Sequence, residues 1–362
     1  MYDSSIIGRH KTEVDSPALL LDMGAVERNI ARMARFFEGK DCKLRPHIKT
    51  HKLPLIGHKQ IDAGAIGVTC AKIREAEVFL QSGIKNVLIA NQIAGDAKIR
   101  RLVNLSRYGD LIVCVDNFEN AEAISKAAEA IGVKMSVLVE VNVGLNRCGV
   151  LYGQPTLDFV RQISKLKGIV FRGVMGYEGG VFVEDVQEKE KICRTANERL
   201  VNTAELVRKD GFPVEIVSAG GSNTYRQTGV YPGITDVQVG SYVTMDSHNA
   251  KFGIDFEQAI FILATVISRP ASDRAITNAG KKAISSDAGF PTPVNPGLEL
   301  YALSEEHGHI RIIDPASAPS IGDNLLLIPT HGCTTIPLYD SYIIIRDDRV
   351  ESIAEIQARQ TS

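Results

Sequence analysis

Hydrophobic and polar positions along the first two-thirds of the chain follow two different periods. Short apolar, β-branched runs are typical of strands, and longer runs with apolar residues every three to four positions are typical of helices. The first clear helical pattern covers residues 23–39, after the apolar run 17–22. Eight strand-like runs follow, most of them separated by helical patterns: residues 42–49, 65–71, 86–91, 111–116, 135–142, 169–177, 214–221 and 236–242.

Eight strands that alternate with helices predict an α/β fold, a (β/α)8 TIM-type barrel over residues 23–245. Glycines stand where the intervening helices should end, as C-terminal caps do; they are Gly83, Gly132, Gly168 and Gly211. A doubly wound sheet is the alternative architecture. It is disfavoured because no G-x-G-x-x-G turn follows an early strand.

The pattern changes near residue 250, where strand-like runs are joined by Gly, Pro and Asp turns. These runs are residues 259–270, 281–289, 298–313, 323–332 and 341–350. The part from residue 246 to 362 is therefore predicted to be a second, mostly β C-terminal domain. Only residues 351–360 at its end read as helix.

Composition and net charge limit the partners and the cellular location that we expect for the protein. The 362 residues carry a formal net charge of −2, which gives no reason to expect nucleic acid or an anionic membrane as partner. No apolar run approaches the roughly 20 residues that span a bilayer. The start lacks the basic-then-apolar order of a signal peptide, so a cytoplasmic protein is expected. Six scattered cysteines without a C-x-x-C pair argue against a disulfide scaffold.

A basic segment at residues 42–52, CKLRPHIKTHK, carries the first candidate chemistry. Arg45, His47, Lys49 and His51 occupy every second position, so a strand would place them on one face. Burying four such groups requires an anionic ligand, whereas an exposed edge strand would leave them solvated. Neighbouring cations also favour the neutral amine of Lys49, the form that attacks a carbonyl to make a Schiff base.

The predicted seventh strand ends in SAGGSNT, which could hold a phosphate group. In barrels of this type, phosphate often binds after strands seven and eight. Backbone N–H groups and hydroxyls would form the cradle: Gly220, Gly221, Ser222 and Thr224, with Tyr242 after strand eight. A phosphate site and a reactive lysine in one barrel mouth indicate either pyridoxal phosphate or a sugar-phosphate aldolase that forms a Schiff base.

Two further motifs could complete a site. Arg147, after the fifth strand, could tune the charge of a cofactor or form a surface ion pair. His331 and Cys333 would share one face if they lay on a strand, and could then bind one metal ion. A buried cysteine beside an ordinary histidine is the alternative. The stretch SEEHGHI at 304–310 adds a polar cluster that could converge on the same site, whereas Asp287 reads as a turn residue.

Several of these motifs together resemble the D-threonine aldolase and D-serine dehydratase group, pyridoxal-phosphate enzymes of the alanine-racemase-like barrel type. The motifs run in order over nearly the whole chain: PALLLDMGAVERNI, RPHIKTHK, VNVGLNRCGV, VMGYEGG, SAGGSNTY, SEEHG and PTHGCTT. The combination of R-P-H-x-K-T-H-K with a late H-x-C is specific to the group. The resemblance implies that residues 1–22 belong to the β domain, together with 246–362, and that the protein is a homodimer.

The resemblance also implies roles for the candidate residues. Lys49 would hold pyridoxal phosphate as a Schiff base, and Arg147 and Tyr177 would approach its ring. Gly220, Gly221, Ser222 and Tyr242 would hold its phosphate. His331 and Cys333 would bind a divalent metal, with a thiolate favouring zinc and an open oxygen-rich sphere admitting manganese.

These expectations lead to a lyase that acts on a small D-β-hydroxy-amino acid. Retro-aldol cleavage of a D-threonine-like substrate would give glycine and an aldehyde, with His51 or a metal-bound hydroxide as base. Dehydration of D-serine or D-3-hydroxyaspartate, with Lys49 removing the Cα proton, is the alternative. An amino-acid racemase needs no metal, so the H-x-C pair disfavours it, and a non-catalytic carrier needs no second domain. The stretch MDSHNAKFG differs from the sequence that is usual in the group. The side chain of the accepted substrate therefore stays open.

Overall fold

The computed structural model describes residues 4–359, which form two compact units. The β unit comprises residues up to Arg32 together with Ser241–Arg359, and the barrel unit comprises Met33–Gly240. The first boundary falls inside helix α1 (Met23–Phe37). The outermost residues of the predicted β domain, 1–3 and 360–362, lie outside the described residues.

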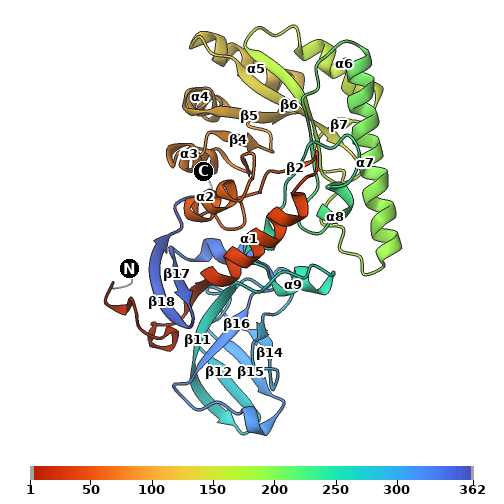
Figure 1. Ribbon diagram of the computed structural model, residues 1–362. Coiled ribbons are helices and arrows are strands. Elements are labelled where there is room, and N and C mark those ends of the chain that lie inside the picture. Colours follow the sequence, from red (N-terminus) through yellow and green to blue (C-terminus); the bar gives the residue numbers. More distant parts are fainter. Residues whose placement is uncertain (1–3, 360–362) are drawn as a thin grey trace. The chain divides into compact units, whose positions relative to one another are not determined.

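The barrel unit contains eight parallel strands in the order β2-β10-β9-β8-β6-β5-β4-β3. Figure 1 labels four of them, β2, β4, β5 and β6. An isolated parallel bridge between His47 and Thr69 joins the two ends of this order, next to β2 and β3. The predicted TIM-type barrel is therefore confirmed. Its strands are β2 (Lys43–Leu44), β3 (Val68–Cys70), β4 (Asn86–Ile89), β5 (Asp110–Val115), β6 (Met135–Asn142), β8 (Ile169–Gly176), β9 (Ile216–Ala219) and β10 (Asp236–Val237). A further short strand, β7 (Val150–Leu151), pairs with β6.

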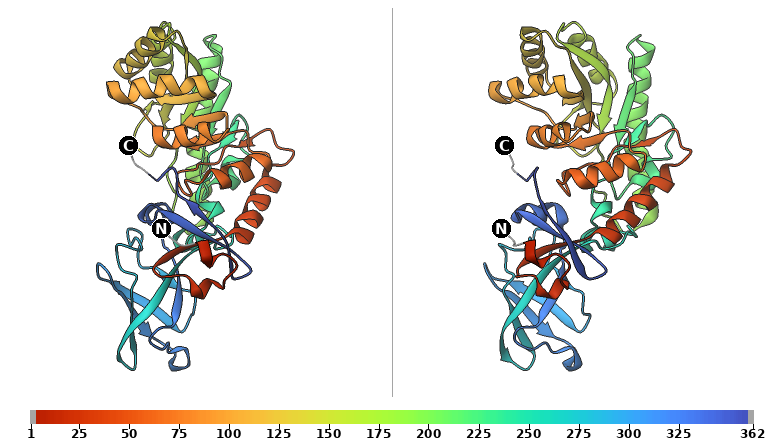
Figure 2. Two further views of the ribbon diagram at one scale, coloured as in Figure 1. Left: turned by 90° about the vertical axis from the view of Figure 1, so that its left-hand side faces the viewer. Right: turned by 60° about the vertical axis from the view of Figure 1, so that its left-hand side comes forward.

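Helices cover the outside of these strands (Figure 2). Their apolar stripes face inward; in α6, for example, Leu157, Val160 and Ile163 are buried. Inside the barrel, alternating strand residues form one cluster that includes Leu88 and Cys114. The helices are α2 (Pro54–Asp62), α3 (Ile73–Gln81), α4 (Asp96–Leu105), α5 (Phe118–Ala130), α6 (Gln154–Ile163), α7 (Val186–Lys209) and α8 (Tyr225–Thr228), with a 3-10 turn at Ser106–Tyr108.

The β unit is a separate sheet with the strand order β14-β15-β12-β11-β1-β17-β18, in which β16 pairs with β11 and β13. The first strand pairs antiparallel with β11 and parallel with β17, so the start of the chain belongs to this sheet. The strands are β1 (Ala18–Asp22), β11 (Ile260–Ala271), β12 (Arg274–Thr277), β13 (Thr292–Pro293), β14 (Leu298–Leu303), β15 (Gly308–Ile312), β16 (Asn324–Ile328), β17 (Ser341–Arg346) and β18 (Arg349–Glu355). Short helices are α9 (Ser247–Lys251) and α10 (Gly332–Thr335), with 3-10 turns at Ser4–Ile6, Lys11–Glu13, Ser241–Val243, Pro315–Ser317 and Ile336–Leu338.

Two local predictions for the β unit are wrong. Residues 351–355, expected to be helical, belong to strand β18, because β18 pairs along its length with β17 and this pairing overrides helix propensity. The two strands are joined at Asp347 and Asp348, whose φ values of 49° and 63° suit a tight hairpin. Residues 281–289, expected to be a strand, form turns instead.

The cysteines and the apolar character of the helices were the subject of two further expectations from the composition. All six cysteines are free, and Cys70 and Cys114 are fully buried in strands, as small apolar side chains would be. Over residues 4–359, none of the helices combines the length and the apolar character that crossing a membrane requires.

Candidate active site

The basic segment is not the alternating strand that its sequence pattern predicts. Strand β2 ends at Leu44, His47 forms a single bridge, and residues 48–51 form a turn. The expectation that Arg45, His47, Lys49 and His51 share one strand face is therefore wrong. Each of the four side chains has its own surroundings, and these surroundings decide which of them can react.

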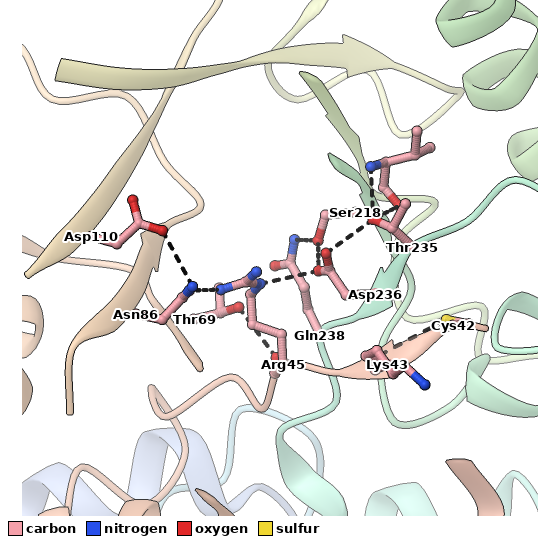
Figure 3. Close-up of polar contacts among 11 residues, drawn as sticks. Cys42, Lys43, Arg45, Thr69, Asn86, Asp110, Ser218, Thr235, Asp236 and Gln238 are labelled. Carbon is pink, nitrogen blue, oxygen red and sulfur yellow. Dashed lines mark hydrogen bonds and ion pairs between the residues drawn. The ribbon is translucent and has the colours of Figure 1, made fainter. Parts of the chain in front are cut away.

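Arg45 is neutralised inside the barrel. Its Nε donates to Asp236 Oδ1 at 3.2 Å, and its Nη1 donates to Asn86 Oδ1 (Figure 3). Asp236 also accepts a 2.5 Å hydrogen bond from Ser218. Both charged side chains are almost fully buried, with 3% and 1% of their surface exposed. Arg45 is thus part of the barrel interior and is not available to a ligand.

Breaking this buried ion pair should destabilise the barrel. Asp236→Asn leaves the Arg45 charge without its counter-ion, and such losses cost about 3–5 kcal/mol in the free energy of unfolding. The matched control is Glu122→Gln, which removes the exposed pair between Glu122 and Lys126 on α5 and should change stability little. Denaturant unfolding of both variants checks the prediction, and equal effects would contradict it.

The two histidines of the segment are buried. Burial, followed by the charges of Lys49 and Lys52, lowers the pKa of His47 well below its usual value. Burial lowers the pKa of His51 to about 3, and His51 Nδ1 accepts the N–H of Leu53 at 3.2 Å. A group with so low a pKa is a weak base, so the surroundings of His51 favour a packing role over the predicted proton transfer.

Lys49 is the exception in the segment. Lys52 pairs with Glu75 of α3, and every residue from Leu44 to Thr50 is buried except Lys49, which is exposed. Its position follows the first strand of the barrel at the strand's C-terminal end, where active residues of this fold gather. Among Arg45, His47, Lys49 and His51, Lys49 is therefore the side chain that is open to a reaction partner.

The predicted phosphate cradle is a tight turn directly after β9. Gly220 has a φ of 73°, which favours glycine, and Gly221 lies against Tyr177, whose Cε2 would be 3.4 Å from an added Cβ. Ser222 Oγ accepts the N–H of Gly240 at 3.0 Å. Thr224 Oγ1 accepts the N–H of Gly221 at 3.0 Å, so Thr224 closes the turn.

Arg147 and Tyr177 contact each other at the same end of the barrel. The Arg147 guanidinium lies 5.6 Å from the centre of the Tyr177 ring, and its Nη2 is 3.6 Å from Glu140 Oε1. Glu140 in turn accepts a 2.5 Å hydrogen bond from Gln92. Burial raises the pKa of Glu140, while Gln92 and Arg147 act against that shift. Glu140 was not among the candidates from the sequence, although a carboxylate within the apolar strand 135–142 is a detectable signal.

These barrel residues fit pyridoxal phosphate. The loops that hold Lys49, Arg147, Tyr177 and the glycine turn all follow C-terminal ends of parallel strands in one unit. At Gly221, a larger side chain would fill the space beside Tyr177. An exposed amine, a guanidinium and a compact glycine turn match the cofactor's carbonyl, phenolate oxygen and phosphate.

The H-x-C pair lies in the β unit, at the start of α10 and not on a strand as expected. His331 is the residue before the helix, and Cys333 lies in its first turn. The two side chains still meet: a hydrogen bond with Cys333 is the largest cause that raises the pKa of His331, to about 9, although burial opposes it. Asp287 also contributes, since its Oδ2 is 2.7 Å from His331 Nδ1.

Asp287 is more than the turn residue that the sequence suggested. Burial acts to raise the pKa of Asp287, but hydrogen bonds from His331, Ser285 and Thr334 lower it overall. A carboxylate on Nδ1 leaves Nε2 of His331 for a metal, the arrangement that most metal-binding histidines show. The residues therefore fit a divalent metal.

Within residues 4–359, no group of three or more His, Cys, Asp or Glu side chains is placed to hold a metal ion. A metal bound by His331 and Cys333 would thus take two protein ligands. Its remaining coordination positions would be open to water or substrate, as in catalytic sites and unlike closed structural sites.

The remaining candidates of the β unit have other neighbours. Tyr242 is fully buried, and its ring centre lies 5.4 Å from that of Phe256. His309 contacts Ser304 at 2.8 Å, and His307 is exposed in the same β14–β15 hairpin. The expectation that the SEEHGHI cluster converges on the site finds no support in these contacts.

Comparison with known proteins gives matches over nearly the whole chain. Residues 21–248 match the family "Alanine racemase, N-terminal domain", and residues 259–345 match "Putative serine dehydratase domain". A D-threonine aldolase of Arthrobacter sp is 38% identical over 355 residues, which cover 96% of this chain and 93% of that protein. A 3-hydroxy-D-aspartate aldolase of Paracoccus denitrificans (strain Pd 1222) is 31% identical, covering 99% of this chain and 96% of that protein.

Among solved structures, the D-threonine aldolase from Filomicrobium marinum is similar with a TM-score of 0.94. The two share 35% sequence identity, and the match covers 98% of each chain. The similarity therefore extends over both units of the chain, and over all the segments that carry candidate site residues.

Proposed function

The chain belongs to the alanine-racemase-like family that includes the D-threonine aldolases, and from this premise we propose that it is a pyridoxal-phosphate-dependent lyase acting on D-β-hydroxy-amino acids. The reaction we favour is retro-aldol cleavage of a D-threonine-like substrate to glycine and an aldehyde. The observation that carries the proposal is the exposure of Lys49 at the barrel mouth, where Arg45 is paired and both histidines are buried.

In this proposal residues 23–245 bind the cofactor, and residues 1–22 with 246–362 form the β-rich domain. Lys49 holds the cofactor; Arg147, Tyr177, Gly220, Gly221, Ser222, Thr224 and Tyr242 contact it. His331 and Cys333 bind a divalent metal, either zinc or manganese. The contacts of His331 with Cys333 and with Asp287 support the metal site. A homodimer belongs to the proposal through the resemblance of the sequence motifs to the group.

The residues around the proposed cofactor site have different roles. When bound, pyridoxal phosphate supplies a carbonyl carbon that amines attack and a ring that accepts electrons from a breaking bond. Lys49 would hold the cofactor through its side-chain amine. The Arg147 guanidinium, which has only hydrogen-bond donors, would hold the phenolate oxygen of the cofactor.

The proposed metal site would act on the β-hydroxyl of the substrate. A divalent metal at His331 and Cys333 would supply a Lewis acid that lowers the pKa of a bound hydroxyl. Asp287 keeps the His331 ring oriented through the hydrogen bond at Nδ1. Cleavage then removes the hydroxyl proton, breaks the Cα–Cβ bond and adds a proton at Cα, which gives glycine and an aldehyde.

The second candidate is dehydration, because residues 259–345 match the serine dehydratase domain. Lys49 would then take the Cα proton, and the β-hydroxyl would leave to give ammonia and a keto acid. Acidic substrates such as D-3-hydroxyaspartate are also candidates, since an aldolase for that compound is 31% identical to this chain.

An assay of the purified protein with D-threonine and D-serine distinguishes these reactions. We expect glycine and acetaldehyde from D-threonine in the presence of zinc or manganese, and loss of both products with chelator. Pyruvate from D-serine as the main product would favour the dehydratase. Inversion at Cα without cleavage, insensitive to chelator, would contradict both lyase reactions and favour a racemase.

A further inference from the structure

A lysine is buried behind the glycine turn. Lys189 lies on α7 with 9% of its surface exposed, although the same helix has solvent-exposed positions on its other side. Burying an ammonium group costs free energy unless it is hydrogen-bonded or faces negative charge. We therefore expect a hydrogen-bond acceptor or a negative charge close to the ammonium group of Lys189.

Asn223 is one hydrogen-bond partner of Lys189. The Nζ atom donates to Asn223 Oδ1 at 2.6 Å, a short distance typical of charge-assisted hydrogen bonds. Asn223 is also buried, and it belongs to the turn 220–224 after β9. Lys189 therefore fixes the orientation of an amide in the predicted phosphate cradle.

The amide of Asn223 extends the contact to a second loop. Its Nδ2 donates to the carbonyl oxygens of Gly180 (2.6 Å) and Val181 (3.0 Å), in the loop that follows Tyr177. Lys189 sets the orientation of the Asn223 amide, because Nζ can only donate a hydrogen bond and therefore contacts the amide oxygen. One buried ammonium group thus connects α7 with both loops that are proposed to contact the cofactor.

We propose that Lys189 is a positioning residue for the cofactor phosphate: it holds Asn223 and the turn 220–224 in place, and its buried charge favours a dianion bound to that turn. The inference rests on the proposed function, because it requires pyridoxal phosphate at this site. Burial is the main cause that lowers the pKa of Lys189; the Cys193 thiol acts to raise it, and Arg226 acts to lower it.

The test compares two forms of the cofactor. Apoprotein is titrated with pyridoxal phosphate and with pyridoxal, which lacks the phosphate, and the absorbance of the lysine adduct gives each dissociation constant. Lys189→Met should weaken binding of pyridoxal phosphate by about tenfold, a typical value for losing a hydrogen bond to a charged group, and leave pyridoxal binding unchanged. Lys189→Arg, which keeps the charge, should restore part of the affinity.

Two further variants complete the design. Lys191→Met, at an exposed position of the same helix, is the matched control and should bind both compounds as the wild type does. Asn223→Asp keeps an acceptor for Lys189 but loses the two Nδ2 hydrogen bonds to Gly180 and Val181, and it adds negative charge beside the phosphate. It should weaken binding of pyridoxal phosphate alone, which keeps the test decisive if Lys189→Met does not fold.

Equal loss of both compounds in Lys189→Met and Asn223→Asp would overturn the inference, because it would indicate a structural role only. Unchanged binding in both variants would overturn it as well. If the wild type binds neither compound and shows no lysine adduct, the proposed function fails, and that result is separate from any difference between variants.

Discussion

Replacing Lys49 with alanine is expected to abolish the covalent link to pyridoxal phosphate and to lower the rate of D-threonine cleavage by about a thousandfold or more. The reason is that Lys49 is the exposed residue between Leu44 and Thr50, whereas Arg45 is held by Asp236 and Lys52 by Glu75. Neither of those paired groups can take over its role without breaking an ion pair.

The measurement is borohydride reduction followed by mass spectrometry of the peptide that contains residue 49. The wild type should carry the reduced cofactor on Lys49, and the alanine variant should carry none. Lys43→Ala is the matched control, because Lys43 is exposed in the same segment and its Nζ bonds only to the backbone oxygen of Lys40. A reduced cofactor attached to another lysine in the wild type would refute the assignment.

The second large effect concerns the β unit. His331→Ala or Cys333→Ala should remove the bound divalent metal and lower aldol cleavage by about a hundredfold or more, since Lewis-acid stabilisation of a developing oxyanion is worth several kcal/mol. Asp287→Asn should weaken metal binding by about 10–100-fold, because the His331 ring loses the carboxylate that orients it.

Metal content after dialysis checks this prediction, together with activity before and after metal is added back. His309→Ala is the control, since His309 contacts Ser304 and is not one of the proposed ligands. The absorbance of the lysine adduct should stay unchanged in the metal-site variants. Full activity of His331→Ala in the presence of chelator would exclude a metal role for the H-x-C pair.

The barrel was predictable from the sequence because its signal is repeated eight times. Each strand is a short apolar run, and most are followed by an amphipathic helix, so an error in one element does not change the architecture. The second sheet was predictable for a similar reason, but its end was not. Residues 351–355 have helical spacing, and their pairing with β17 is a contact that the local pattern does not contain.

The partners of the site residues were harder to predict, because the groups that neutralise charges are distant in sequence. Arg45 meets Asp236 across 191 positions, and His331 meets Asp287 across 44. The alternation of the basic segment suggested that Arg45, His47, Lys49 and His51 share one face. In the structure only Lys49 of these four is exposed, since internal partners or burial account for the other three.

The pairing of β1 has a consequence for how the chain is made. Residues 18–22 find their sheet partners at residues 260–263 and 343–345, after the whole barrel has been synthesised. Until then, the three consecutive leucines Leu19, Leu20 and Leu21 have no sheet to join, and unpaired apolar strands attract other chains. A nascent or truncated chain that stops before residue 260 should therefore aggregate through its first strand, and its recovery should depend on chaperones that cover that strand.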